Sequence, residues 1–115
     1  MTIMTAEYIW IDGSEPVPAL RSKARVLPFK EISDVKDFPE WSFDGSSTNQ
    51  ATGNDSDCIL KPVNFVMDPL RDCGYLVLCE VYNPDNKTPH LTNNRAKLRA
   101  VLESSKDHDM WAGFE

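Results

Sequence analysis

The residues best suited to chemistry lie in one polar stretch, Trp41-Ser-Phe-Asp-Gly-Ser-Ser-Thr-Asn-Gln-Ala-Thr-Gly-Asn-Asp-Ser-Asp57. From Asp44 to Asp57 the one aliphatic side chain is Ala51, so the stretch predicts a long surface loop. Trp41 and Phe43 are expected to anchor the entrance of this loop by packing. Two hydroxyl side chains follow the Asp-Gly step at Asp44, which places one carboxylate among small polar groups in a tight turn. The turn predicts a cradle for a small cationic or polar ligand.

Two other interpretations of these carboxylates have to be weighed. An Asp44-Gly45 pair is also common in simple turns, because both residue types favour turn geometry. Asp55 and Asp57 could begin a calcium-binding loop, but the remaining ligands and the glycine at the required spacing are missing. The calcium interpretation is therefore set aside, and the turn interpretation stays open on composition alone.

The bulk composition excludes several classes of protein. A chain of 115 residues with 41% hydrophobic and 26% charged residues is typical of one globular domain. Its formal net charge of -6 argues against nucleic-acid binding, which requires a basic surface. The N-terminus does not resemble a signal peptide, and no apolar run is long enough to cross a membrane. These features predict a cytoplasmic protein that binds neither nucleic acid nor membrane.

The cysteines and histidines do not form a pattern typical of a metal or disulfide site. Cys58, Cys73 and Cys79 are odd in number and contain no C-x-x-C pair. Cys58 and Cys79 stand in apolar runs and are expected to pack as small hydrophobic residues. His90 and His108 lie far apart in the sequence, and both are expected to be exposed to solvent.

The elements that must position the polar loop are four strands and one helix. The apolar stretch 75–82 is expected at the centre of the sheet, and 58–67 is expected to be interrupted at Pro62, as an edge strand or two pieces. Thr92 is the expected N-cap of a helix with an apolar stripe at Leu98, Val101 and Leu102. The predicted strands are 7–12, 20–27, 58–67 and 75–82, the first two forming a hairpin, and the helix is 92–105. The fold class is α+β, a mixed sheet with one long polar loop and a C-terminal helix.

The second predicted strand alternates between basic and small side chains. Arg21, Lys23 and Arg25 fall on one face, and Ser22, Ala24 and Val26 fall on the other. The basic face is expected to be a solvated edge. The alternative is a surface for an acidic neighbour or an anionic ligand.

At this point the motifs resemble a known family. In their order and spacing they are similar to the start of a glutamine synthetase, most closely the type II (eukaryotic-like) form, and the likeness covers nearly all of the chain from about residue 7. The matching motifs are Tyr-Ile-Trp-Ile-Asp-Gly (8–13), Leu-Arg-Ser-Lys-Ala-Arg (20–25), Pro-Glu-Trp-Ser-Phe-Asp-Gly-Ser-Ser-Thr (39–48), Asp-Pro-Leu-Arg (68–71), Leu-Cys-Glu-Val-Tyr (78–82), Thr-Asn-Asn-Arg (92–95) and Trp-Ala-Gly-Phe-Glu (111–115).

The resemblance implies a domain organisation. Residues 1–6 would be a flexible N-terminus, residues 7–91 a β-grasp N-terminal domain, and residues 92–109 a helix and linker. Residues 110–115 would be the first strand of a catalytic domain that is missing from this sequence, so the chain is expected to be a cut or truncated form.

The resemblance also implies a reaction and its partners. ATP phosphorylates glutamate, and ammonia then displaces the phosphate; two or three Mg²⁺ or Mn²⁺ ions take part in the catalytic domain. Subunits form a ring, which is a double ring in type II enzymes, and the N-terminal domain of one subunit completes the active site of its neighbour. Alone, the chain is expected to be inactive and to bind none of these cofactors.

The family's site residues map onto this sequence one by one. Asp44 matches the aspartate that binds ammonium and takes a proton from it, and Ser47 matches the hydroxyl beside that site. Gly45 would allow the turn that aims both groups, with Trp41 and Ser46 supporting the loop. An ammonium ion becomes a nucleophile only after it loses a proton, and a carboxylate can both attract the cation and accept that proton.

Glu115 matches the first glutamate of the family's Glu-x-Glu metal motif, whose second position lies outside the sequence, so the site would be incomplete. Two functions from other classes remain as alternatives. One is a standalone β-grasp binding or regulatory module without catalysis, because a fold does not fix a function. The other, weaker alternative is a sugar-binding or small-ligand domain that uses Trp41 and the hydroxyl-rich loop.

Overall fold

The computed structural model describes residues 2–115 and contains one five-stranded sheet and one α-helix. The strand order is β2-β1-β5-β4-β3, and β1 and β5 are parallel while the other neighbours are antiparallel. The elements are β1 (Ile3–Ile11), β2 (Leu20–Pro28), a 3₁₀ turn (Val35–Asp37), β3 (Trp41–Asp44), a 3₁₀ turn (Gly45–Thr48), β4 (Asp57–Met67), β5 (Gly74–Tyr82) and α1 (Asn94–Ser104). The predicted α+β class, the hairpin of the first two strands and the central position of β5 are confirmed.

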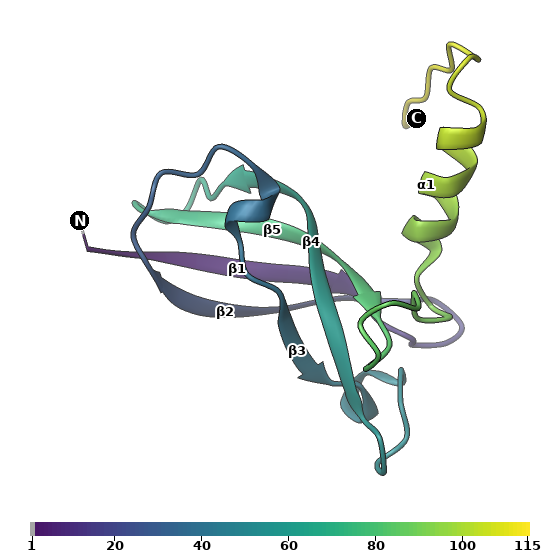
Figure 1. Ribbon diagram of the computed structural model, residues 1–115, viewed down its shortest axis with the longest axis horizontal. Coiled ribbons are helices and arrows are strands. Elements are labelled where there is room, and N and C mark those ends of the chain that lie inside the picture. Colours follow the sequence, from purple (N-terminus) through teal and green to yellow (C-terminus); the bar gives the residue numbers. More distant parts are fainter. Residues whose placement is uncertain (1) are drawn as a thin grey trace.

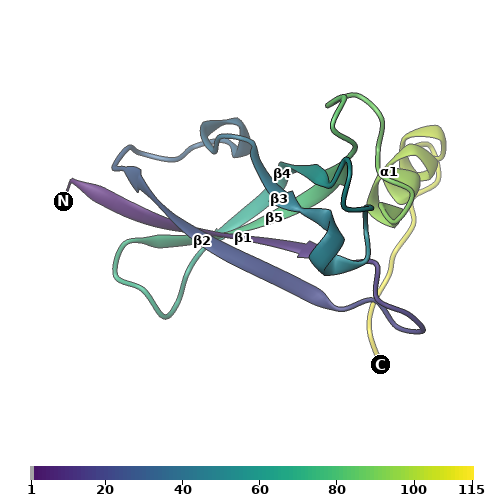
Figure 2. The same ribbon diagram turned by 90° about the horizontal axis from the view of Figure 1, so that it is seen from below.

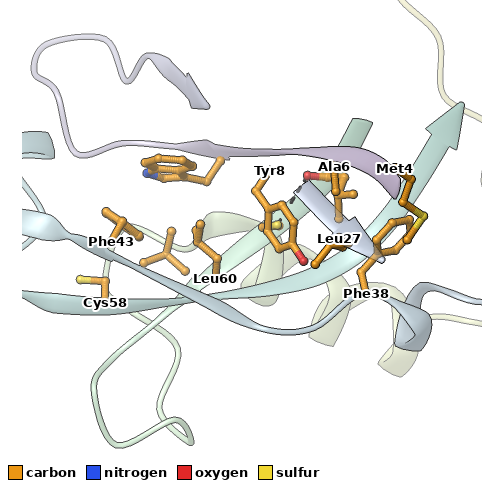
Figure 3. Close-up of a cluster of buried hydrophobic side chains, with 12 residues drawn as sticks. Met4, Ala6, Tyr8, Leu27, Phe38, Phe43, Cys58 and Leu60 are labelled. Atoms are coloured by element: carbon orange, nitrogen blue, oxygen red, sulfur yellow. Dashed lines mark hydrogen bonds between the residues drawn. The ribbon is translucent and has the colours of Figure 1, made fainter. Parts of the chain in front are cut away.

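The core forms because β1 alternates strictly between buried and less buried side chains. Met4, Ala6, Tyr8 and Trp10 are buried, and each lies two residues from the next, so all four point to the same face. Figure 3 shows Met4, Ala6 and Tyr8 pointing from β1 into the space that Leu60 and the other core side chains fill. Burial raises the pKa of the Tyr8 hydroxyl to about 12.

The first strand begins earlier than the sequence pattern indicated. It starts at Ile3 instead of residue 7, so residues 3–6 are not the flexible segment that was expected; residue 1 lies outside the described residues. The reason is that Met4 and Ala6 continue the buried face of Tyr8, while the neighbouring strand β2 pairs with β1 as far as Ile3. Short alternating starts such as Ile-Met-Thr-Ala are easily overlooked because Met and Ala carry little strand signal.

β4 is one continuous strand, contrary to the predicted interruption at Pro62. Its register with β5 shifts between Pro62 and Asn64, which marks an irregularity in the pairing. β3 pairs with β4 over Asp57–Leu60, so Pro62 lies beyond the residues that need an N–H donor on that side. The edge-strand prediction therefore holds for the second half of β4 and is wrong for the first.

The N-cap of the helix lies one residue later than predicted, and the helix extends away from the sheet (Figure 1). Its N-cap is Asn93, whose side chain accepts a hydrogen bond from the Ala96 N–H, whereas Thr92 bonds elsewhere. Arg99 anchors α1 to β5 through two bonds to the buried carboxylate of Glu80, Nε to Oε1 at 3.1 Å and Nη2 to Oε2 at 2.7 Å. Within residues 2–115 no helix is both long and apolar enough to cross a membrane.

The predicted apolar stripe of α1 is exposed, with Leu98, Val101 and Leu102 each 45–56% accessible. Residues 110–115 do not form the predicted strand; they are extended and exposed, and Trp111 is among the most accessible apolar side chains. A strand requires a hydrogen-bonded neighbour, and no described segment pairs with these residues.

Candidate functional site

The polar stretch is shorter and better ordered than a 17-residue loop. Its first four residues, Trp41–Asp44, form strand β3, which pairs with the beginning of β4. Trp41 packs edge-on against Tyr8, with ring centroids 5.4 Å apart, and Phe43 lies 4.6 Å from the ring of Trp10. Both aromatic residues anchor the entrance of the loop, as predicted, but they do so as members of a strand.

Asp44 lies where β3 ends and the 3₁₀ turn begins. Its carboxylate oxygen Oδ1 accepts hydrogen bonds from the Ser46 N–H at 3.0 Å and the Ser46 hydroxyl at 2.6 Å. Asp44 is therefore the N-cap of this turn, in agreement with the turn interpretation of the Asp-Gly pair. The side chain is exposed, and the bonds from Ser46 lower the pKa of its carboxyl group. An ionised carboxylate is thus presented at the surface.

Ser47 lies beside this carboxylate on the same exposed turn. Its hydroxyl donates a hydrogen bond to the backbone carbonyl of Asp44 at 2.9 Å. A hydroxyl that donates its proton still has lone pairs with which to accept a hydrogen bond. The turn therefore brings together Asp44, Ser46 and Ser47, and it offers acceptor oxygens to a cation that carries N–H groups.

Gly45 is required here for space, which differs from the predicted reason. No glycine of the described chain has a positive φ, so the freedom of a glycine backbone is not what the turn uses. Gly45 is buried, and a Cβ atom there would lie 2.8 Å from Cys58 Sγ and 3.0 Å from Ala51 Cβ. The chain after Asp44 passes so close to β4 that a larger residue would displace the turn.

The inner side of the loop is buried, although its composition predicted a loop that runs over the surface. Thr48 is 6% and Gln50 5% accessible, and Asn49 adopts a left-handed conformation at φ 58°. Asn49 also donates from Nδ2 to the carbonyl of Gly13 at 2.8 Å, and the Gly13 N–H donates to the Thr48 carbonyl at 3.0 Å. In Figures 1 and 2 this loop, the β1–β2 connection and the segment before α1 gather at one end of the sheet.

His90 belongs to this cluster, and its predicted exposure is wrong. It is 8% accessible, and its ring contacts the Gln50 carbonyl through Nε2 and the Thr92 hydroxyl through Nδ1. The sequence gave no signal for the burial of His90. One partner, Gln50, lies 40 residues away, and the other, Thr92, is two residues away but forms no recognised motif with His90. His108 is exposed, as expected.

Lys23 and Arg25 of β2 lie on the core side of the sheet, so the solvated-edge interpretation is wrong for these two side chains, whereas Arg21 is exposed. Register places Lys23 opposite Tyr8 and Arg25 opposite Ala6, both members of the buried face. Lys23 Nζ lies 3.7 Å from the centre of the Trp41 ring and donates to the Ser42 carbonyl; Arg25 Cζ lies 4.9 Å from the same ring. Burial, then the charge of Arg25, lowers the pKa of the Lys23 ammonium. The long aliphatic stems cover the open edge of the core.

An open hollow of about 310 Å³ lies between β2 and the turn. Cationic side chains of β2 line one side of it, and Asp44 with Ser47 lines the other. Asp44 thus faces a hollow that cationic side chains also line, while the lowering of its carboxyl pKa comes from its hydrogen bonds, those from Ser46 first.

Asp12 is a buried site that the sequence reasoning did not single out. Its carboxylate accepts four hydrogen bonds: from the N–H and hydroxyl of Ser14, from the Ala19 N–H and from Arg21 Nε, at 2.8–2.9 Å. Burial alone would raise the pKa of this carboxyl, but the bonds from Ala19, Arg21 and Ser14 outweigh it and hold the pKa well below its usual range. Its position in phase with Tyr8 and Trp10, just before Gly13, is the signal that could have identified it.

The described residues do not provide a metal site. Within residues 2–115 no three His, Cys, Asp or Glu side chains lie close enough together to hold a metal ion. Glu115 is exposed in the extended C-terminal stretch. Residues 2–115 thus do not by themselves complete a site for Mg²⁺ or Mn²⁺, and the role of Glu115 as a ligand stays a prediction.

Comparison with known proteins identifies what this arrangement is similar to. The sequence model of the family described as "Glutamine synthetase, beta-Grasp domain" matches residues 2–84. The chain is 50% identical over 121 aligned residues to the chloroplastic glutamine synthetase of Chlamydomonas reinhardtii, covering 97% of this chain and 32% of that protein.

Two bacterial relatives give the same picture. Identity is 48% to the glutamine synthetase of Bradyrhizobium diazoefficiens, covering 100% of this chain and 32% of the relative. It is 54% to the glutamine synthetase of Streptomyces viridochromogenes, covering 96% and 32%. The chain spans about a third of the length of the curated relatives it matches.

Proposed function

The chain belongs to the glutamine synthetase family, as its β-grasp domain, and we propose that it is the N-terminal part of an enzyme that joins ammonia to glutamate with ATP. In this proposal the turn that carries Asp44 and Ser47 enters the active site of a neighbouring subunit and binds the ammonium ion there. The observation that supports it best is the exposed, ionised carboxylate of Asp44, held by Ser46 at the end of a strand.

The geometry suits an ammonium ion in two respects. The ion carries a positive charge and N–H donors, and the turn offers the Asp44 carboxylate and the Ser47 hydroxyl oxygen on one surface. The two hydrogen bonds from Ser46 end on Oδ1, and the Ser56 side chain also lowers the pKa of this carboxyl; a carboxylate has about four lone-pair sites, so it keeps capacity to accept. Because the carboxylate is presented by a capped turn instead of a free side chain, little ordering is needed on binding.

Proton transfer requires a change in the environment of Asp44. A lowered pKa favours attraction of the cation but makes the carboxylate a weak base. Contact with a neighbouring subunit would bury the carboxylate, and burial raises a carboxyl pKa. The same residue would then bind ammonium on entry and accept its proton once the site is closed.

The remaining parts of the reaction are assigned outside this chain. Glutamate, ATP and the Mg²⁺ or Mn²⁺ ions would be bound by a catalytic domain, and the ring-shaped assembly, a double ring in this proposal, would bring that domain to Asp44. ATP and the metal would supply phosphorylation of glutamate and its electrostatic support. The boundaries at residues 91 and 110 and the cytoplasmic location remain predictions; one relative is named as chloroplastic.

A chimaera tests this proposal. This chain replaces the matching third of the Bradyrhizobium glutamine synthetase, and glutamine formation is followed with Asp44→Asn and, as a matched control, Asp57→Asn. Asp57 is the cross-strand partner of Asp44 and is also exposed, so it reports the general effect of removing a nearby charge. We expect kcat/KM for ammonium to fall about 100-fold or more in Asp44→Asn, the usual range for a lost acid–base group, and to change little in the control. Equal values in an assembled chimaera would exclude the ammonium role and favour a non-catalytic binding module.

A further inference from the structure

We propose that His90 and Gln50 are positioning residues for the Asp44 turn, and that they fix it to the central strand at the point where α1 begins. The inference rests on the proposed function, because it names the residues that hold the ammonium-binding carboxylate in place. It depends on a continuous series of buried hydrogen bonds from β5 to the residue after Asp44.

The series begins at the carbonyl of Gly45, directly after Asp44. This oxygen accepts hydrogen bonds from the Gln50 N–H at 2.8 Å, the Ala51 N–H at 3.1 Å and the Thr48 hydroxyl at 3.2 Å. The Asn49 N–H also donates to this oxygen, and the Gly45 N–H donates to the Ser56 carbonyl at 2.6 Å, so the peptide after Asp44 is held both from within its loop and by the residue before β4. Among the groups that hold it from within, Gln50 is the one that links the turn to the start of α1.

Gln50 is in turn fixed from outside the loop. It is 5% accessible, and its side-chain Nε2 donates to the Thr92 hydroxyl at 2.9 Å and to the Ile11 carbonyl at 3.3 Å. Its backbone carbonyl contacts His90 Nε2. A buried residue held at both its side chain and its backbone has little freedom to move.

The partners of His90 determine which ring nitrogen carries the proton. The Thr92 backbone N–H can only donate, and it points at His90 Nδ1 at 3.1 Å. Nδ1 must therefore be the acceptor, so the proton of the neutral ring is on Nε2, where it is donated to the Gln50 carbonyl. This bond joins the site loop to the segment that precedes α1.

The segment that carries His90 is anchored to the central strand. The His90 N–H donates to the Val81 carbonyl at 3.0 Å, and Asn93 Nδ2 donates to the same oxygen at 3.0 Å. Asn93 also caps α1. The rigid strand β5, the beginning of the helix and the Asp44 turn thus meet through two side chains, His90 and Gln50.

Two substitutions of His90 separate the positioning bond from general packing. Glutamine places an N–H donor near the position of Nε2 and keeps the bond to Gln50, whereas asparagine places its oxygen near Nδ1 and keeps only the bond from Thr92. Both remove the ring, so both lose similar packing. In the chimaera we expect His90→Asn to raise the KM for ammonium about 10-fold or more, with the KM for glutamate and ATP unchanged, because small displacements of a positioning group are costly. His90→Gln should stay within about 2-fold.

A second readout does not depend on activity. In the 115-residue chain, hydrogen exchange of the Gln50 and Ala51 amides should be faster in His90→Asn than in His90→Gln, because these amides bond the Gly45 carbonyl only while the loop is held. If His90→Asn fails to fold, Thr92→Val replaces it, with Thr92→Ser as the conservative variant that keeps the hydroxyl for Gln50.

The outcomes distinguish the two proposals. Equal ammonium KM values and equal exchange in the two His90 variants, in a chimaera where Asp44→Asn impairs ammonium use, overturn the positioning role and leave the proposed function intact. If Asp44→Asn has no effect, the proposed function fails. The positioning of the turn is then decided by exchange alone, and equal rates in the two His90 variants overturn it.

Discussion

Replacing Asp12 by asparagine should destabilise the fold by about 2–3 kcal/mol, because it removes one charge-assisted bond and weakens three others. The asparagine would keep an oxygen for the two bonds that end on Oδ1, those from the Ser14 and Ala19 N–H groups. In place of Oδ2, an NH₂ group would face Arg21 Nε, and both of these groups are donors. In the wild type Arg21 Nε lies 2.8 Å from Oδ2. The Ser14 hydroxyl can rotate and accept, so its bond survives in reverse.

The size of this destabilisation depends on which of the groups bonded to Asp12 can form hydrogen bonds with water when Asp12 is replaced. Arg21 is about half exposed (46%), so it regains water when its partner is lost, and the cost is the net value of one charged bond, about 1.5–3 kcal/mol. Asp12→Ala removes all four acceptor contacts and leaves the Ala19 N–H without its partner, so it should cost about 4 kcal/mol. For a domain whose total stability is on the order of 5–15 kcal/mol, either loss is large.

Urea unfolding at neutral pH measures these differences as a shift in midpoint at constant slope. The pH dependence provides a second check. The folded pKa of Asp12 is lowered, so its contribution is fully present above the unfolded value near 4 and is lost as the pH falls toward the folded pKa. The difference in free energy of unfolding between wild type and Asp12→Asn should therefore become smaller below about pH 4. A difference under about 0.5 kcal/mol at pH 7, or a difference that becomes larger in acid, would refute the reasoning.

Three further changes have directions set by the structure. Gly45→Ala should destabilise by about 1–3 kcal/mol and impair ammonium use, because its Cβ would lie 2.8 Å from a buried sulfur; urea unfolding and KM measure this. Lys23→Met should cost about 1 kcal/mol in urea unfolding, because it keeps the packing over Trp41 but removes the cation and its bond to β3. Arg99→Met should reduce helicity by circular dichroism and cost more than Glu80→Gln, because it leaves a buried carboxylate without its partner, whereas the exposed arginine is rehydrated.

Each of these changes has a control within the same chain. Gly53→Ala meets no atom within 4 Å and should be neutral, so an equal loss there would show that the Gly45 effect is not one of space. Lys36→Met removes an exposed charge and controls for Lys23. Equal losses of stability in Arg99→Met and Glu80→Gln would contradict the reasoning, because Glu80 is buried and Arg99 is exposed, which predicts unequal losses.

Much of the sheet could be predicted because its signals are local. Alternation in β1 and the apolar run of β5 reflect which faces are buried, and burial follows directly from side-chain type. Cys58 and Cys79 pack in the core as predicted, and burial raises the pKa of the Cys79 thiol to about 12. The family motifs identified the β-grasp domain for a different reason, through ordered likeness and not through physics.

The sequence predictions were wrong where one local pattern is compatible with two structures. Alternation in β2 separates Lys23 and Arg25 from Ser22 and Ala24, but it does not say which face meets the core. Charge suggested solvent, whereas the structure uses the long stems of the basic residues to cover an aromatic ring at the sheet edge. Only the register with β1, a non-local fact, decides between the two.

The polar loop is a second case in which local composition did not predict which side chains are buried. Its composition predicts exposure, yet Thr48 and Gln50 are buried, because the Thr48 hydroxyl and the Gln50 Nε2 donate to partners inside the molecule. Asp44 and Ser47 are among the loop residues that remain outside, and their oxygens keep capacity to accept a hydrogen bond. This division gives a physical criterion for choosing site residues within a polar loop: the buried members hold the turn, and the exposed members can bind a ligand. It assigns His90 and Gln50 to holding the turn, and it leaves the ammonium ion to the carboxylate that the turn presents.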